Sequence, residues 1–170
     1  MKKILFSVCL VVFAASADAQ SKIAYINSQS IMEQLPEAQD AQKQLDALTQ
    51  EWQAEMNRMA SEIQRKVEEY DKRKLILTDK RRAEIEKELQ ELDAKMIDFR
   101  NQKFGTNGEL FTKQGELMKP IQEKLFKAVK DVADAEGYDY VIDRSSSTLL
   151  LYASASHDLT QKVLAKIQQK

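Results

Sequence analysis

The chain has 170 residues, of which 31% are charged and only 7% are aromatic, with four glycines and two prolines. This balance is typical of long solvated helices and argues against a large compact core within one chain. A formal net charge of −1 argues against nucleic-acid binding, and one histidine with one cysteine leaves few ligands for a metal site.

Residues 1–19 have the pattern of a cleaved signal peptide. Two lysines are followed by an apolar run that is too short to span a bilayer, and Ala17 and Ala19 provide the small residues of a cleavage site. The only cysteine, Cys9, lies in this segment, and the bulky residues before it do not fit a lipoprotein signal. We expect an exported protein whose mature chain starts at Gln20 and contains no disulfide.

The mature chain opens with a short β-rich run, Lys22 to Asn27, which predicts a strand. Ser28 or Ser30 can then cap a short helix. Pro36 follows at a position suited to a helix start, because the N–H that proline lacks has no partner there.

Residues 36–136 are predicted to form two long amphipathic helices that fold back on each other as an antiparallel coiled coil. The chain breaks near residues 75–80, the predicted tip, where Thr78 or Asp79 can cap the second helix. A narrow apolar stripe cannot bury enough surface alone, so each arm needs the other as a partner. The stripe comprises Ala41, Leu45, Leu48, Trp52, Met56, Met59, Ile63, Val67 and Tyr70 in the first arm, and Ile85, Leu89, Leu92, Met96, Phe99, Phe111, Gln114, Met118, Ile121, Leu125, Ala128 and Val132 in the second.

The second arm is interrupted by Gly105 and Gly108, and Pro120 follows. These residues disfavour a helix interior, so one interpretation is a loop that divides the arm into two helices. The other is a continuous helix with a kink. We favour the kink, because the apolar spacing is strong on both sides.

The chain ends with a compact pattern. Gly137 fits the left-handed cap of the long helix, and Tyr138 to Asp143 predicts a second strand. After a serine-rich turn, Thr148 to Ala153 predicts a third strand, and Ser156 or Asp158 can cap a final helix.

These elements predict a mainly α chain with a small β part (α+β). The arm occupies residues 36–136, and residues 20–35 and 137–170 form a β-body with a C-terminal helix. Two or three strands do not make a stable sheet alone, so we expect several chains to share one β-body, from which each helical hairpin projects.

Residues with catalytic potential are sparse. His157 has no second histidine or cysteine to share a metal, and a surface or capping role fits it better. The Gly105-x-x-Gly108 pattern lacks a preceding strand and a phosphate-binding lysine. We therefore expect no enzyme activity, no cofactor and no metal.

Two surfaces remain as candidate sites. Between residues 65 and 87, nine cations face six anions, which can attract anionic lipid headgroups or acidic client segments, or can form a solvated mixed-charge tip. Flexible apolar side chains on the arms can contact client proteins. Packing between the two arms is, however, the favoured explanation for the positions of these side chains. The basic tip comprises Lys72, Arg73, Lys74, Lys80, Arg81 and Arg82, and the candidate client-binding residues are Met56, Met59, Met96, Phe99 and Met118.

The order of elements resembles the Skp/OmpH-like periplasmic chaperones of bacteria with two membranes. The resemblance rests on the opening strand, Lys22 to Asn27, on the long helical hairpin, and on the closing run from Ile121 to Asp143. It covers essentially all of the mature chain. One departure is the sequence pI of about 6.0, since the best-known members are strongly basic, and we carry over no lipopolysaccharide site.

The resemblance implies a periplasmic homotrimer that acts as an ATP-independent holdase. It implies that unfolded outer-membrane β-barrel proteins are held in a cavity between the helical arms, which prevents their aggregation. An alternative that shares the fold is an exported coiled-coil spacer or adaptor that docks one fixed partner through its hairpin tip. We expect no nucleic-acid partner.

Overall fold

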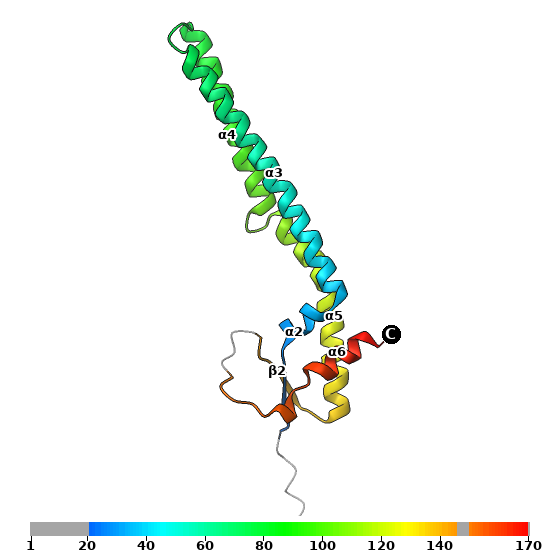
Figure 1. The fold of residues 1–170 in the computed structure, drawn as a ribbon. Coiled ribbons are helices and arrows are strands. Elements are labelled where there is room, and N and C mark those ends of the chain that lie inside the picture. The colour runs from blue at the N-terminus through cyan, green and yellow to red at the C-terminus, as the bar shows by residue number, and fades with distance from the viewer. Residues whose placement is uncertain (1–20, 146–149, 170) are drawn as a thin grey trace, which may run out of the picture. The chain divides into compact units, whose positions relative to one another are not determined.

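The computed structural model of the chain describes residues 21–145 and 150–169 (Figure 1). The predicted signal peptide lies outside the described residues. The chain divides into two units, one formed by residues 36–122 and one by the residues before 36 and after 122. Long helices and one small sheet make up the described part, which confirms the predicted mainly α class.

The helical unit is built on a hairpin of α3 (Pro36–Arg73) and α4 (Asp79–Phe104), which lie side by side (Figure 1). Near its start α3 buries Ala41, Leu45 and Trp52, as the predicted stripe requires. Farther toward the tip the stripe residues of both helices are mostly half-buried. Two helices alone cover each stripe only in part, so apolar surface stays in contact with solvent along much of the hairpin.

The second arm is divided by a loop, so the favoured kink is wrong. Helix α4 ends at Phe104, and α5 (Glu109–Glu136) begins after four intervening residues. A Cβ on Gly105 would lie 2.3 Å from the backbone oxygen of Asn101, and one on Gly108 would lie 2.8 Å from the backbone nitrogen of Gly105. The turn is therefore too tight for any side chain at either glycine, whereas Pro120 is accommodated within α5.

Aromatic and ionic contacts brace this loop. Trp52, only 5% exposed, meets Phe104 edge-to-face with 5.8 Å between ring centroids. The Lys103 ammonium lies 4.7 Å from the centroid of the Trp52 ring and also pairs with Glu109 in the first turn of α5. The two sides of the interruption are thus tied to each other and to α3.

The second unit holds a parallel two-stranded sheet of β1 (Ile23–Ile26) and β2 (Tyr140–Asp143). Ile23 pairs with Tyr140 and Ile26 with Asp143, so the predicted strands at the two ends of the mature chain do meet. Besides residues 123–136 of α5, this unit holds the helix α2 (Ser28–Gln34), the 3₁₀ turn η2 (Ala155–His157) and the helix α6 (Thr160–Gln168). Its largest fully buried side chains are Ile31, Leu159 and Val163.

The start of α2 is fixed differently from the prediction. Asn27 is the N-cap, and its side-chain oxygen accepts a hydrogen bond from the Ser30 N–H at 3.0 Å, so neither predicted serine caps the helix. Ser28 instead donates its hydroxyl and its N–H to Asp143 at the end of β2. Ser145 adds its own N–H and hydroxyl to the same carboxylate, at 3.0 and 2.7 Å.

This Asp143 cluster joins β2, the start of α2 and the following turn. Partial burial raises the pKa of Asp143, but the hydrogen bonds from Ser28 and Ser145 outweigh that effect and hold the pKa below its usual range. The ionised carboxylate therefore stabilises this unit. At α6 the N-cap is Leu159, which makes no side-chain capping hydrogen bond, so neither predicted residue, Ser156 or Asp158, is the N-cap. Asp158 instead accepts a hydrogen bond from the Thr160 N–H at 2.9 Å.

The predicted third strand does not form over its described residues, 150–153, and Thr148 and Leu149 lie outside the described range. Strands require a neighbour for their N–H and C=O groups, and in a single chain residues 150–153 have none in the sheet, which contains β1 and β2. Leu151 and Tyr152 are almost fully exposed, at 87% and 85%.

Candidate functional site

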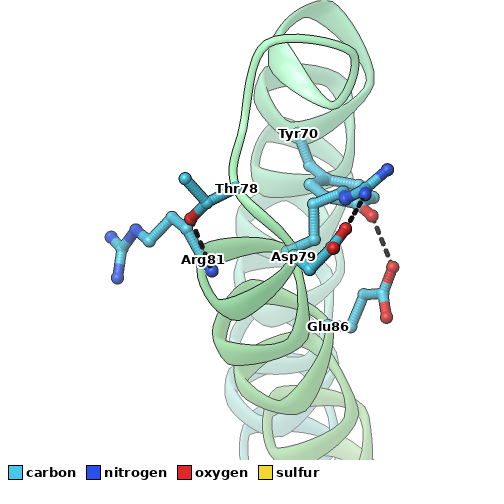
Figure 2. A network of polar contacts seen from close by, with 6 residues as sticks. Tyr70, Thr78, Asp79, Arg81 and Glu86 are labelled. Carbon is cyan, nitrogen blue, oxygen red and sulfur yellow. Dashed lines mark hydrogen bonds and ion pairs between the residues drawn. The ribbon is translucent and has the colours of Figure 1, made fainter.

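The hairpin tip is the best-defined candidate surface (Figure 2). Its turn spans residues 74–78, where the Ile76 N–H donates to the Arg73 carbonyl at 3.0 Å. Thr78 caps α4 as predicted, because its hydroxyl oxygen accepts from the Arg81 N–H at 3.3 Å. Internal hydrogen bonds thus hold both the start and the end of the turn.

The tip presents two adjacent aliphatic residues to solvent. Leu75 is 92% exposed and Ile76 is 83% exposed, whereas the next residue, Leu77, is half-buried. Leu77 contributes to a groove between α3 and α4, together with Tyr70 and Ile85. The sequence contained the signal for this surface, since three consecutive apolar residues at 75–77 fit no helical stripe.

The six predicted tip cations divide into two groups. Three are in ion pairs along the helices: Lys74 with Asp71 at 2.9 Å, Arg81 with Glu84 at 2.9 Å, and Arg82 with Asp79. Within the described parts of the chain, the other three, Lys72, Arg73 and Lys80, take part in no ion pair. Uncompensated positive charge therefore remains on both sides of Leu75 and Ile76.

Contacts between the helices fix the tip just below the turn. Lys66 on α3 pairs with Glu88 on α4 at 2.5 Å, which lowers the pKa of Glu88. The Tyr70 hydroxyl donates to the Glu86 carboxylate (Figure 2), and this hydrogen bond raises the pKa of Tyr70. The phenol stays protonated at neutral pH and can hold the two helices together there.

The five candidate client-binding side chains occupy intermediate environments. Met56 and Met59 on α3, Met96 and Phe99 on α4, and Met118 on α5 are all half-buried. Each is partly covered by the arms and keeps part of its surface open to solvent. Client contact at these positions stays a prediction.

Two aromatic residues on α5 are largely exposed to solvent. Phe111, which the predicted stripe placed between the helices, is 63% exposed. The prediction is wrong at Phe111, although Ile121 and Leu125 farther along the same stripe of α5 are buried. Phe126, in the other unit, is 69% exposed. Neither residue was identified as a candidate site.

The described part of the chain offers few other candidates for chemistry. His157 is half-buried and stacks edge-to-face on Tyr138, with 5.9 Å between ring centroids, and its Nδ1 atom has no hydrogen-bond partner there. Among the described residues, no three His, Cys, Asp or Glu side chains gather as metal ligands. Over the same residues, every helix is too short or too polar to cross a bilayer.

Comparison with known proteins gives the family. The family described as "Outer membrane protein (OmpH-like)" matches residues 22–167. The chain belongs to the OmpH-like family. The matched range contains the opening strand, the hairpin and the closing run on which the resemblance rested, so that resemblance is confirmed.

Two relatives and one solved structure extend this result. The chaperone protein Skp of Pectobacterium atrosepticum is 30% identical over 176 residues, which cover 99% of this chain and 100% of the relative. The chaperone protein Skp of Photorhabdus luminescens is 28% identical over 177 residues, with the same coverage. An OmpH-like protein of Caulobacter crescentus CB15 shares the fold, with a TM-score of 0.70, 14% identity, and 89% of this chain and 86% of that chain covered.

Proposed function

We propose that this chain is an ATP-independent periplasmic holdase that binds unfolded outer-membrane β-barrel proteins and prevents their aggregation. The observation that carries the proposal is the full-length similarity to chaperones named Skp within the OmpH-like family. Half-buried methionines along the arms suit the task, since flexible thioethers adapt to apolar segments of varied sequence. Barrel strands alternate apolar and polar residues and need such protection before insertion.

The proposed function does not require the arms to bind a nucleotide. The loop between α4 and α5 contains the Gly105-x-x-Gly108 pattern. Within this loop, the Gly108 N–H donates a hydrogen bond to the Gly105 carbonyl at 2.8 Å. That N–H group is engaged within the loop and does not face outward as in a phosphate cradle. Binding and release of clients would therefore depend on many weak contacts, with no catalytic step.

We further propose that the active form is a homotrimer. A two-stranded sheet is marginal alone, and the exposed Leu151 and Tyr152 lie within the predicted third strand, whose described residues have no partner in the sheet of one chain. A sheet shared by several chains would give these residues neighbours. Export through a cleaved signal peptide, residues 1–19, belongs to the same proposal.

The alternative function is a spacer or adaptor that docks a fixed partner at the tip. The exposed Leu75 and Ile76 favour it, because they would be the natural contact for such a partner. The two functions predict different responses to mutation. An adaptor loses binding when the tip is changed, whereas a holdase spreads its contacts along the arms.

The test is suppression of aggregation. A urea-unfolded outer-membrane barrel protein is diluted rapidly into buffer with or without the mature chain, and light scattering reports aggregation. We expect suppression at about one client per trimer, measured by multi-angle scattering. A matched pair of variants, Leu75→Ser with Ile76→Ser at the tip and Met59→Ser with Met96→Ser on the arms, identifies the surface. Undiminished aggregation with a folded, oligomeric protein would exclude the holdase.

A further inference from the structure

We propose that Asn107, in the loop between α4 and α5, is a site of spontaneous deamidation that the folded loop protects. Its conversion to aspartate and isoaspartate requires the loop to open, so the products accumulate on chains whose loop spends time open. The inference concerns a covalent modification and is independent of the proposed chaperone function.

Asn107 has the most favourable neighbour for deamidation among the four asparagines of the chain. It precedes Gly108, whereas Asn27, Asn57 and Asn101 precede serine, arginine and glutamine. Deamidation begins when the backbone nitrogen of the following residue attacks the side-chain amide, and glycine has no Cβ to hinder that approach. The side chain of Asn27 is engaged as the cap of α2, and the other two asparagines lie within the hydrogen-bonded backbones of α3 and α4.

The reaction has two steps and uses only water. In the first step the Gly108 nitrogen loses its proton and forms a bond to Cγ of Asn107, while the bond from Cγ to the side-chain nitrogen breaks. The departing nitrogen takes up a proton and leaves as ammonia, and the product is a five-membered succinimide. Water then adds to one of the two ring carbonyl carbons, and the C–N bond at that carbon breaks. Opening at Cγ gives aspartate, and opening at the backbone carbonyl carbon gives isoaspartate.

In the folded loop the attacking nitrogen is already engaged. The Gly108 N–H donates to the Gly105 carbonyl at 2.8 Å, and Gly108 is buried although Asn107 beside it is exposed. A succinimide nitrogen carries no hydrogen, so the ring cannot form without loss of that hydrogen bond. The space around the nitrogen is also closed, since a Cβ on Gly108 would lie 2.8 Å from the Gly105 nitrogen and 2.9 Å from the Gln102 carbonyl oxygen. The backbone of the loop must therefore move before Asn107 reacts.

Contacts on both sides of the loop oppose that movement. Phe104, the last residue of α4, meets the ring of Trp52 with 5.8 Å between centroids. Lys103 pairs with Glu109 across the loop. The free energy of opening sets the fraction of time for which the nitrogen is released, so the rate at Asn107 depends on these contacts.

The two products differ in their effect on the loop. Aspartate keeps the length of the backbone, and its carboxylate precedes the first turn of α5, where the helix dipole favours negative charge. Isoaspartate directs the backbone through the side-chain carbons and adds one methylene to the turn. The turn has no room for a longer path, because Gly105 and Gly108 approach other backbone atoms more closely than a Cβ allows. Chains that carry isoaspartate should therefore unfold at lower denaturant concentration than Asn107→Asp.

The experiment incubates the full mature chain at mildly alkaline pH, either folded in buffer or unfolded in guanidinium chloride. Trypsin cleaves after Lys103 and Lys113, and the peptide between these sites contains Asn107 as its only asparagine. Mass spectrometry measures the deamidated fraction, and labelling by an isoaspartyl methyltransferase detects isoaspartate. In the unfolded chain we expect Asn107 to convert faster than the other asparagines. In the folded chain we expect its conversion to be slower by about tenfold or more.

Phe104→Ala and Phe111→Ala form a matched pair of variants. Phe104 contacts Trp52 beside the loop, whereas Phe111 is 63% exposed. Phe104→Ala should raise the rate at Asn107 in the folded chain by about tenfold, and Phe111→Ala should leave it unchanged. In guanidinium chloride both variants should react at the rate of the parent chain, since the residues next to the asparagine are the same. If Phe104→Ala does not fold, Glu109→Gln removes the pair with Lys103 and should raise the ratio of the folded to the unfolded rate.

Slow conversion in the folded chain, together with faster conversion when the loop contacts are removed, supports the inference. Equal rates at Asn107 in the folded and unfolded chains would overturn it. Faster conversion of another asparagine in the unfolded chain would also overturn it, as would equal rates in folded Phe104→Ala and Phe111→Ala. Aggregation suppression does not enter these measurements, so failure of the proposed function and failure of this inference are distinguishable.

Discussion

Gly105 and Gly115 offer a matched pair of substitutions with opposite predicted effects. Both are glycines of the second arm, but Gly105 ends α4 while Gly115 lies inside α5. A methyl group on Gly105 would meet the Asn101 oxygen at 2.3 Å, whereas one on Gly115 would meet nothing within 4 Å. Gly105→Ala should therefore destabilise the chain, and Gly115→Ala should stabilise it.

The magnitudes follow from these environments. For Gly105→Ala the backbone must move by about 1 Å to restore ordinary contact, which breaks the 2.9 Å hydrogen bond from the Gly105 N–H to the Asn101 carbonyl. The lost hydrogen bond costs about 1 kcal/mol, and the steric overlap adds about 1–3 kcal/mol. Gly115→Ala should gain about 0.8–1 kcal/mol from helix propensity.

Urea unfolding, followed by circular dichroism and by the fluorescence of Trp52, measures both effects. Protein concentration must be held constant, because oligomerisation contributes to apparent stability. Trp52 contacts Phe104 beside the altered loop, so its signal should respond to Gly105→Ala more than to Gly115→Ala. If Gly105→Ala were neutral or stabilising, the interruption would be a tolerant kink and our account of the loop would be wrong.

Three further predictions concern other parts of the chain. Asp143→Asn should lower the free energy of unfolding by about 1–2 kcal/mol at neutral pH. Because the folded-state pKa of Asp143 is depressed, its stabilisation exists above the unfolded-state value of about 3.9 and is lost as pH falls below it. A parent–variant difference that stayed constant from neutral pH to pH about 3 would contradict this account. Glu86→Gln should lower the pKa of Tyr70 toward its ordinary value, because the hydrogen bond to Glu86 raises that pKa. Phenolate absorbance as a function of pH measures the pKa, and Tyr70→Phe assigns the signal. An unchanged pKa of Tyr70 in Glu86→Gln would refute the contact. Leu151→Asp should reduce the oligomer mass in multi-angle scattering while Ile97→Asp leaves it intact, and an unaltered mass would remove Leu151 from the interface.

Periodicity predicted the long elements well, because a stripe of apolar residues is dictated by helix geometry. The hairpin follows from such a stripe, whereas the strands Ile23–Ile26 and Tyr140–Asp143 were predicted from short β-rich runs. The interruption at Gly105 was misjudged because the strong apolar spacing on both sides was given more weight than the low helix propensity of the two glycines. The observed turn requires glycine at this position, because a Cβ on Gly105 would lie 2.3 Å from the Asn101 carbonyl oxygen, and only coordinates contain that distance.

The candidate sites were predictable to different degrees. The sequence shows directly which residues of the tip are cations. It does not show which of these cations pair with carboxylates, because ion pairing depends on side-chain rotamers and on helix phase. Asp79 and Arg82 pair one turn apart, while Lys80 between them does not. Exposure of Phe111 was missed, because periodicity places a residue on one face of a helix without showing whether another element covers that face at that point. The third strand needed a neighbour that one chain does not supply.

The pairing of β1 with β2 has a consequence for the order in which the chain folds. The Lys22 N–H donates to the Asp139 carboxylate across 117 positions, so the sheet cannot form until nearly the whole chain is available. Closing so long a segment is entropically costly, whereas the helices of the hairpin form through local contacts. A hairpin that forms first brings its own ends together and shortens the effective loop. During export, the N-terminal strand emerges first and must wait for its partner with unpaired backbone groups, which makes the newly translocated chain itself a transient candidate for protection by finished copies.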